Sequence, residues 1–248
     1  MNFQNLEADL DSKKPMVGVR VGSILGENGQ KDVNTTFEEF KEMVLGEIRQ
    51  LDDERKDESE DGEITKKRLD ILVDSSLCFT FLGTNISNPV QIISKAQLQT
   101  IPEEHSSLTN HNQSSSFVLY NLARMKTIIR TFDECVSRGE YPRLPSPQDL
   151  NLSLLSEPEE WELMFNFILN FQNVLSQCSK SLCLSKLVIF LCALSSTFSR
   201  YYSRVKILKD PLPHLIPSVH ARIFFVSSLC DVIIEALGIL NINYIPSM

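Results

Sequence analysis

The chain has 248 residues, a formal net charge of -8, 42 % apolar residues and 23 % charged residues. This composition excludes a wholly disordered or fibrous protein and is typical of a folded, soluble protein with one large or two small domains. The six cysteines form no Cys-x-x-Cys pair and mostly lie in apolar stretches. They therefore argue against a disulfide framework or a zinc site and predict an intracellular, cytoplasmic protein.

The first part of the chain combines short strand and helix signals with one strongly acidic run. Valines that alternate with other residues over 17–21 predict a strand, and Asn28-Gly29 predicts a turn. Thr36, followed closely by two glutamates, predicts the start of a helix. Residues 52–63 hold eight acidic and two basic side chains, which predicts a solvated loop.

The secondary structure predicted for the middle of the chain is ambiguous, whereas that of the second half is clearly helical. Residues 64–81 fit a helix or a strand, and residues 83–113 are rich in Ser, Asn, Thr and Gln, which predicts a connection. Beyond them, apolar side chains recur every three or four positions and predict four amphipathic helices, at residues 115–138, 156–175, 182–208 and 218–237. A capping box at Ser156 is expected to begin the second helix, and Gly238 to end the fourth. We therefore expect a mainly α protein with a helical bundle.

Sequence signals for catalysis, metal binding and membrane insertion are absent. The chain lacks H-E-x-x-H, G-x-S-x-G and G-x-x-x-x-G-K-[ST], so neither a catalytic residue nor a cofactor is predicted. The four histidines lack metal-ligand spacing, so no metal is predicted. The most apolar stretch, residues 187–198, is shorter than the roughly 20 residues that a membrane-spanning helix needs. We expect a protein that is not an enzyme and does not enter a membrane.

Cationic and aromatic side chains stand out on two of the expected helices. Interleaved aromatic and basic residues are suited to stacking unpaired RNA bases and neutralising phosphates. An ordinary amphipathic helix has the same composition, and tyrosine and arginine also pack one helix against another, so the residues alone leave these interpretations open. The candidate RNA contacts are Tyr120, Arg124, Lys126, Arg130, Arg200, Tyr201, Arg204 and Lys206.

Three segments of the second half follow, in order, the motifs of one family. Residues 116–125 read Ser-Phe-Val-Leu-Tyr-Asn-Leu-Ala-Arg-Met and resemble the opening helix of the DALR anticodon-binding domain, in which an apolar residue precedes Tyr-x-x-Ala-Arg. Residues 198–208 resemble the family's Phe-x-x-Phe-Tyr segment with Arg/Lys-Val-Leu after it. Residues 221–248 resemble the closing helix and terminus of arginyl-tRNA synthetases. The resemblance covers about residues 112–248 and implies a helical anticodon-binding bundle there.

The first half resembles, more faintly, the region that precedes this domain in arginyl-tRNA synthetases. Residues 21–31 fit a Gly-x-Ile-Leu-Gly-Glu-x-Gly-x-Lys pattern. We therefore expect two domains: residues 1–111 as a small mixed α/β segment that resembles the end of a class I synthetase catalytic region, and residues 112–248 as the helical domain. The His-Ile-Gly-His motif that such enzymes use for ATP is absent, and a Lys-Met-Ser-Lys-Ser loop is not recognisable near residues 30–35. The Asp-Ala-Leu-Arg tetrapeptide is also missing.

The resemblance therefore points to the non-catalytic members of the family. It implies an accessory protein that recognises the anticodon arm of an arginine tRNA and presents it to the tRNA methyltransferase that makes 3-methylcytidine. Two alternatives stay open: a fragment or divergent relative of arginyl-tRNA synthetase with aminoacylation activity, and a helical scaffold for protein partners. The nearly neutral balance of 13 acidic and 12 basic residues over 101–248 keeps the scaffold hypothesis open.

Overall fold

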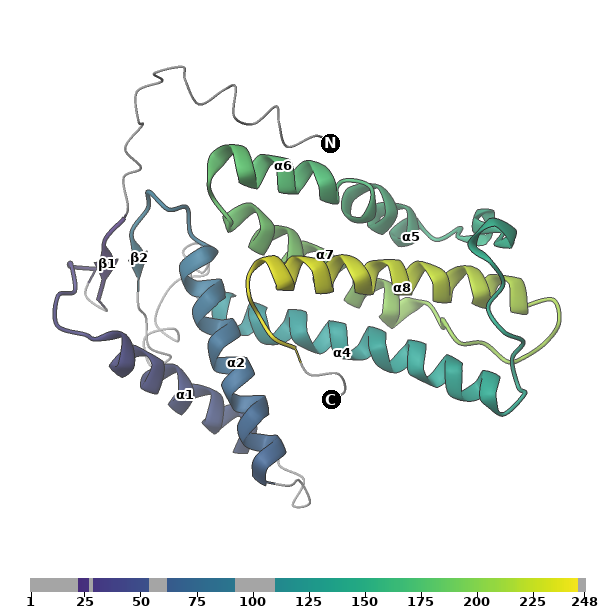
Figure 1. Ribbon diagram of the computed structural model, residues 1–248, viewed down its shortest axis with the longest axis horizontal. Coiled ribbons are helices and arrows are strands. Elements are labelled where there is room, and N and C mark those ends of the chain that lie inside the picture. Colours follow the sequence, from purple (N-terminus) through teal and green to yellow (C-terminus); the bar gives the residue numbers. More distant parts are fainter. Residues whose placement is uncertain (1–21, 27–28, 54–61, 92–109, 245–248) are drawn as a thin grey trace, which may run out of the picture.

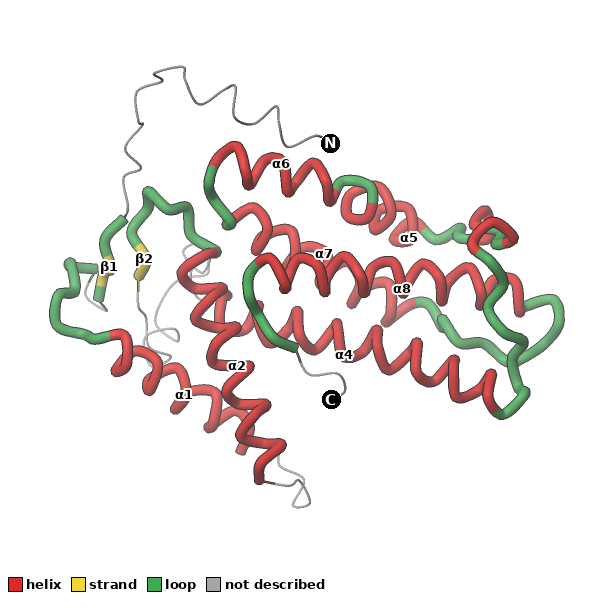
Figure 2. Tube along the Cα trace, viewed as in Figure 1, coloured by secondary structure: helices red, strands yellow, loops and turns green. Residues whose placement is uncertain are grey.

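The structure is a computed structural model that describes residues 22–26, 29–53, 62–91 and 110–244 (Figures 1 and 2). Helices dominate it, as the sequence predicts. Two strands of two residues each, β1 and β2, pair in parallel, with Ile24 opposite Val90. The strands and α-helices in chain order are β1 (Ile24–Leu25), α1 (Phe37–Asp53), α2 (Gly62–Leu82), β2 (Val90–Gln91), α4 (Asn110–Ser137), α5 (Pro158–Leu163), α6 (Phe171–Ser181), α7 (Ser185–Arg204) and α8 (Ile216–Ile239). Two short 3-10 helices, η3 (Pro147–Asp149) and η4 (Leu152–Leu154), lie between α4 and α5.

Helices α1 and α2 form a small pair with its own core. The backbone N–H of Thr36 donates to Glu39 Oε2 at 2.7 Å, and the N–H of Glu39 donates back to Thr36 Oγ1 at 3.2 Å. This reciprocal capping box confirms the predicted start of α1. The residues from 64 to 81, for which the sequence left helix and strand open, lie within α2. The predicted strand at 17–21 and most of the acidic run lie outside the described residues.

The main core lies where α4, α7 and α8 run side by side (Figure 1). Each of these helices turns a mainly apolar face inward, and on α8 this buried face also includes His220 and Arg222. Fully buried members of the core include Val118, Leu122, Met125, Leu187, Leu191, Leu194, Phe198, Val226, Leu229 and Ile233. Phe79 of α2 joins the same core, so α2 contacts the bundle as well as α1. The predicted division after residue 111 stays a prediction.

The second predicted helix differs most from the structure. It begins one residue later than predicted, because the backbone N–H of Glu157 donates to Glu160 Oε2 at 3.0 Å and so replaces Ser156 in the capping box. It is also not continuous. After α5, a π-helical turn, η5 (Met164–Ile168), leads into a separate α6, and the N–H of Leu169 reaches the carbonyl of Met164 at 3.0 Å.

The ends of the last two helices also differ from the prediction. Helix α7 begins at Ser185 rather than 182, because Leu182 adopts a left-handed conformation with φ of 49°. Helix α8 continues through Gly238 to Ile239. Asn241, with φ of 56°, takes the left-handed position that usually falls to glycine, so Gly238 does not end the helix.

A buried carboxylate connects α5, α7 and α8. Glu160 has no exposed surface, and its Oε1 accepts from the Tyr201 hydroxyl at 2.8 Å and from Arg222 Nε at 2.8 Å. Its other oxygen accepts the N–H of Glu157, so both carboxylate oxygens have partners. Burial, followed by the nearby Glu160 carboxylate, raises the pKa of Tyr201, which keeps the phenol a neutral donor.

Tyr201→Phe should lower stability. The change leaves the buried Glu160 carboxylate with one donor fewer, which costs about 1.5–3 kcal/mol for a hydrogen bond to a charged group. Thermal unfolding followed by circular dichroism should show a melting temperature several degrees lower. Tyr202→Phe, one residue further on the exposed side of α7, is the matched control and should leave the melting temperature unchanged. Equal melting temperatures for wild type and Tyr201→Phe would contradict the role of the network.

Candidate nucleic-acid interface

One arginine lies between two tyrosines on the face that α4 and α7 share. Arg124 Cζ is 4.5 Å from the ring centroid of Tyr120, one turn earlier on α4, and 4.6 Å from that of Tyr202 on α7. Arg124 Nη2 also donates to the Tyr120 hydroxyl at 2.6 Å. Within the described part of the chain, no carboxylate pairs with Arg124. Among the described residues, its charge is therefore held in place by aromatic rings rather than by an acidic partner.

Both tyrosines of this arginine sandwich, which consists of Tyr120, Arg124 and Tyr202, are accessible to solvent. Tyr120 is 47 % exposed and Tyr202 is 40 % exposed, although large aromatic side chains usually bury most of their surface. A cavity of about 430 Å³ lies next to Tyr202, lined by residues 202–208 at the end of α7 and by Ile128 of α4. Its lining includes an apolar wall and two cations, Arg204 and Lys206. The face therefore combines accessible rings, cationic groups and a hollow.

Most of the other predicted contacts are paired with carboxylates. Arg204 lies against Glu159 of α5, and Glu159 itself is nearly buried. The other ion pairs are between exposed or half-exposed side chains: Arg200 with Glu162 at 3.3 Å, Lys206 with Asp210 at 3.6 Å, and Arg130 with Glu134 at 3.7 Å. Exposed pairs of this kind are weak and are screened by salt, so their cations can exchange partners.

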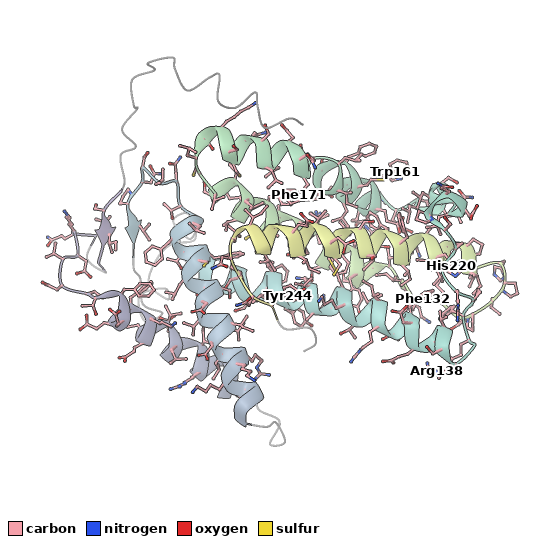
Figure 3. The ribbon with its side chains drawn as sticks, in the orientation of Figure 1. Phe132, Arg138, Trp161, Phe171, His220 and Tyr244 are labelled. Atoms are coloured by element: carbon pink, nitrogen blue, oxygen red, sulfur yellow. The ribbon has the colours of Figure 1, made fainter. Side chains whose placement is uncertain are left out.

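Lys126 lies apart from the arginine sandwich. Its Nζ is 4.1 Å from the ring centroid of Tyr244, in the chain that follows α8. Figure 3 shows Tyr244 beside α4. The structure thus brings Tyr120 and Arg124 together with Tyr202, and it gathers Arg204 and Lys206 at the cavity. It leaves Lys126, Arg130 and Arg200 in separate contacts.

The prediction for Tyr201 is wrong. Its ring has no exposed surface, and its hydroxyl is used by Glu160, so it cannot stack on a base in this structure. The exposed ring is that of Tyr202, which the candidate set omitted. Helical phase carries the signal, because Tyr201 continues the apolar stripe of Leu187, Leu191, Leu194 and Phe198, whereas Tyr202 lies about 100° further round the helix.

The described residues hold no other recognisable chemical site. No group of three or more His, Cys, Asp or Glu side chains among them is placed to bind a metal ion. No helix in the described part of the chain combines the length and the apolar character that crossing a bilayer requires. His220 is buried beside Phe132, with its Nε2 3.2 Å from the carbonyl oxygen of Pro142, so it packs the bundle.

Comparison with known proteins gives a family match over the helical half. The sequence profile of the DALR anticodon binding domain matches residues 118–248. The chain is 25 % identical over 221 residues to DALR anticodon-binding domain-containing protein 3 of Danio rerio, which covers 85 % of this chain and 38 % of that protein. The Rattus norvegicus protein of the same name is 34 % identical over 168 residues, or 62 % of this chain and 31 % of that protein.

The similarity extends to arginyl-tRNA synthetases. Arginine–tRNA ligase of Borrelia hermsii is 25 % identical over 234 residues, which cover 94 % of this chain and 35 % of the enzyme. The chain therefore spans about a third of the length of the relatives it matches.

Solved structures share the fold. The Thermus thermophilus arginyl-tRNA synthetase superposes with a TM-score of 0.64 at 18 % identity, over 91 % of this chain and 34 % of that one. The Plasmodium falciparum enzyme gives a TM-score of 0.56 at 15 % identity, over 85 % of this chain and 32 % of that one. At these identities the likeness concerns the fold alone. The family match spans more than half of the sequence, and the chain belongs to the DALR anticodon-binding domain family.

Proposed function

We propose that the α4–α7 face binds the anticodon arm of a tRNA. The observation that carries the proposal is Arg124, a cation that lies between two exposed tyrosines and that no carboxylate of the described residues neutralises. Single-stranded loops are recognised by stacking bases on aromatic rings and on guanidinium planes, while cations contact the phosphates. The sandwich offers both kinds of surface at one place.

The cavity beside Tyr202 adds a place for an unstacked base. Its volume of about 430 Å³ falls in the range of small-ligand pockets. Ile128 and the Tyr202 ring supply apolar surface, and Arg204 supplies a cation for the adjoining phosphate. An anticodon loop presents such unpaired bases, whereas a continuous duplex does not.

The charge pattern of the chain supports the same face. From Leu163 to Lys209 the sequence contains no Asp or Glu and six Lys or Arg residues. Among the described residues, the cationic side chains near the end of α7 pair with carboxylates on α5 and at Asp210, all outside this span. RNA phosphates therefore compete with a few carboxylates for these cations.

The finer function that we propose is that of a non-catalytic accessory protein in the cytoplasm. Arginine tRNA is the favoured ligand, because relatives include an arginine–tRNA ligase and the fold is that of arginyl-tRNA synthetases. Presentation of that tRNA to a 3-methylcytidine methyltransferase is supported by the resemblance of residues 116–124 to the accessory members. The missing ATP motifs support a role without aminoacylation.

A tRNA titration at several salt concentrations tests the proposal. The full chain should bind an arginine tRNA more tightly than an unrelated tRNA. The logarithm of its affinity should fall linearly with the logarithm of salt concentration, because phosphate contacts release counterions. Absence of binding at low salt would refute the proposal for the isolated chain.

Arg124→Ala should weaken tRNA binding about tenfold or more, which corresponds to about 1.4 kcal/mol. The melting temperature should stay within about a degree of wild type, because the side chain is half-buried on the surface of α4 and its contact with the buried Asn121 Oδ1 is long, at 3.5 Å. Fluorescence anisotropy with labelled tRNA measures the first quantity, and thermal unfolding the second. Parallel losses of affinity and stability would show that Arg124 only packs the helices.

Glu159→Gln should strengthen tRNA binding. The wild-type carboxylate lies against Arg204 and has one buried oxygen without a hydrogen-bond partner, so the neutral amide frees Arg204 for a phosphate. One additional phosphate contact should steepen the salt dependence by about 0.7–0.9 in the log–log slope. Asp74→Asn removes the same charge from an exposed pair with Lys41 on α1 and is the matched control. Equal effects of the two variants on tRNA affinity would show that the change in net charge, and not the release of Arg204, causes the effect.

A further inference from the structure

An apolar ridge runs along the outer side of α5 and the π-helical turn. It consists of Trp161, Phe165 and Leu169, which are spaced four residues apart and are 45 %, 55 % and 63 % exposed. The Trp161 and Phe165 rings stack with centroids 5.7 Å apart and planes 14° apart. Figure 3 shows Trp161 on the outer side of the bundle. Isolated exposed apolar side chains are ordinary, but three large ones in line mark an interaction surface.

The electrostatics of this apolar ridge differ from those of the α4–α7 face. The sequence has no Lys or Arg between Arg143 and Lys180, so α5 and the π-helical turn carry no cation of their own. The arginine that reaches the ridge from α7, Arg200, is paired with Glu162. Glu157 and Glu162 lie at the α5 end of the ridge and are both partly exposed, although Glu157 is 3.9 Å from Arg222 Nη2 and Glu162 pairs with Arg200. A phosphate backbone would meet carboxylates here and would have to compete with Glu162 for Arg200.

The local backbone and packing also support an interaction surface at the ridge, as opposed to apolar side chains that are exposed without a role. The π-helical turn Met164–Ile168 interrupts the helix where the ridge passes, and such turns are frequent at functional sites. Phe167 and Phe171, which flank the outward-facing Leu169, pack inward on Phe190 of α7 at centroid distances of 5.4 and 5.7 Å. The ridge therefore rests on a rigid aromatic layer while its own rings stay free.

We propose that the apolar ridge is a docking surface for a protein partner whose contacting segment is apolar with a Lys or Arg beside it. The apolar side chains of that segment pack on Trp161 and Phe165, and its basic residue meets Glu157 and Glu162. Tryptophan is among the residue types that most often dominate binding energy at protein interfaces. This docking surface is separate from the RNA-binding face and does not rest on the proposed function.

Trp161 is the only tryptophan of the chain, so its fluorescence reports on this surface directly. A display library of random 16-residue peptides is selected on the full chain, with Trp161→Ser as the counter-selection target. Peptides that depend on Trp161 should contain apolar residues and Lys or Arg. A synthetic peptide from that set should shift the Trp161 emission to shorter wavelength, because binding removes the indole from water.

Variants then localise the peptide site by anisotropy with a labelled peptide. Trp161→Ser and Phe165→Ser should each weaken binding at least about tenfold. Ile189→Ser, which changes an equally exposed apolar residue on α7, should leave the affinity within about twofold. Two separate substitutions in the ridge keep the test valid if one variant folds poorly.

Several outcomes would overturn the docking proposal. Selection of acidic peptides, or of none that depend on Trp161, would show that the surface lacks the stated preference. A change of Trp161 emission on adding tRNA would make the ridge part of a nucleic-acid surface. A change with protein concentration alone would make a second copy its occupant. Because tRNA affinity is measured separately through Arg124, failure here leaves the proposed function untouched.

Discussion

The arrangement of the bundle depends on one buried carboxylate. Glu160 lies in the core, and a charge without water must be paired and fully hydrogen-bonded to be tolerated. Its partners come from three places: the Tyr201 hydroxyl on α7, Arg222 on α8, and the backbone at the start of α5. The bond from Tyr201 and the buried apolar stripe of α7 together set the rotation of α7 about its axis. Tyr202, the next residue, is thereby directed outward, where it contacts Arg124.

The two kinds of cation on the α4–α7 face have different physical consequences. Arg124 is oriented by aromatic rings, so it keeps its full charge and its position without the cost of releasing a carboxylate. Arg204 is held by Glu159 and becomes available to a phosphate only when that pair breaks. The first arrangement favours a preorganised contact with an anionic ligand. The second would make the affinity for such a ligand depend on salt concentration and on the glutamates of α5. Together they explain how a chain of net charge -8 can present a locally cationic face.

The sequence predicts helices better than it predicts which side chains they expose. The capping box at Thr36 is a local signal and places the start of α1 correctly. The apolar periodicity identifies α4 as a helix, but the helix begins at Asn110, before the predicted start at 115 and inside the connection predicted over residues 83–113. The π-helical turn after α5 has no local signature. Tyr201 and Tyr202 are chemically identical neighbours, and only the helical phase and the distant Glu160 separate the buried ring from the exposed one. The ion pairs of Arg200 and Arg204 join residues 38 and 45 positions apart, beyond the reach of sequence periodicity.

The most direct test of the account locates the tRNA on the protein. An arginine tRNA that carries 4-thiouridine in its anticodon loop can be photo-crosslinked to the full chain, and the modified peptides identified by mass spectrometry. The account predicts cross-links to the peptides that contain Tyr120 and Tyr202, on α4 and at the end of α7. Cross-links confined to α1 and α2, or to the ridge at Trp161, would contradict it.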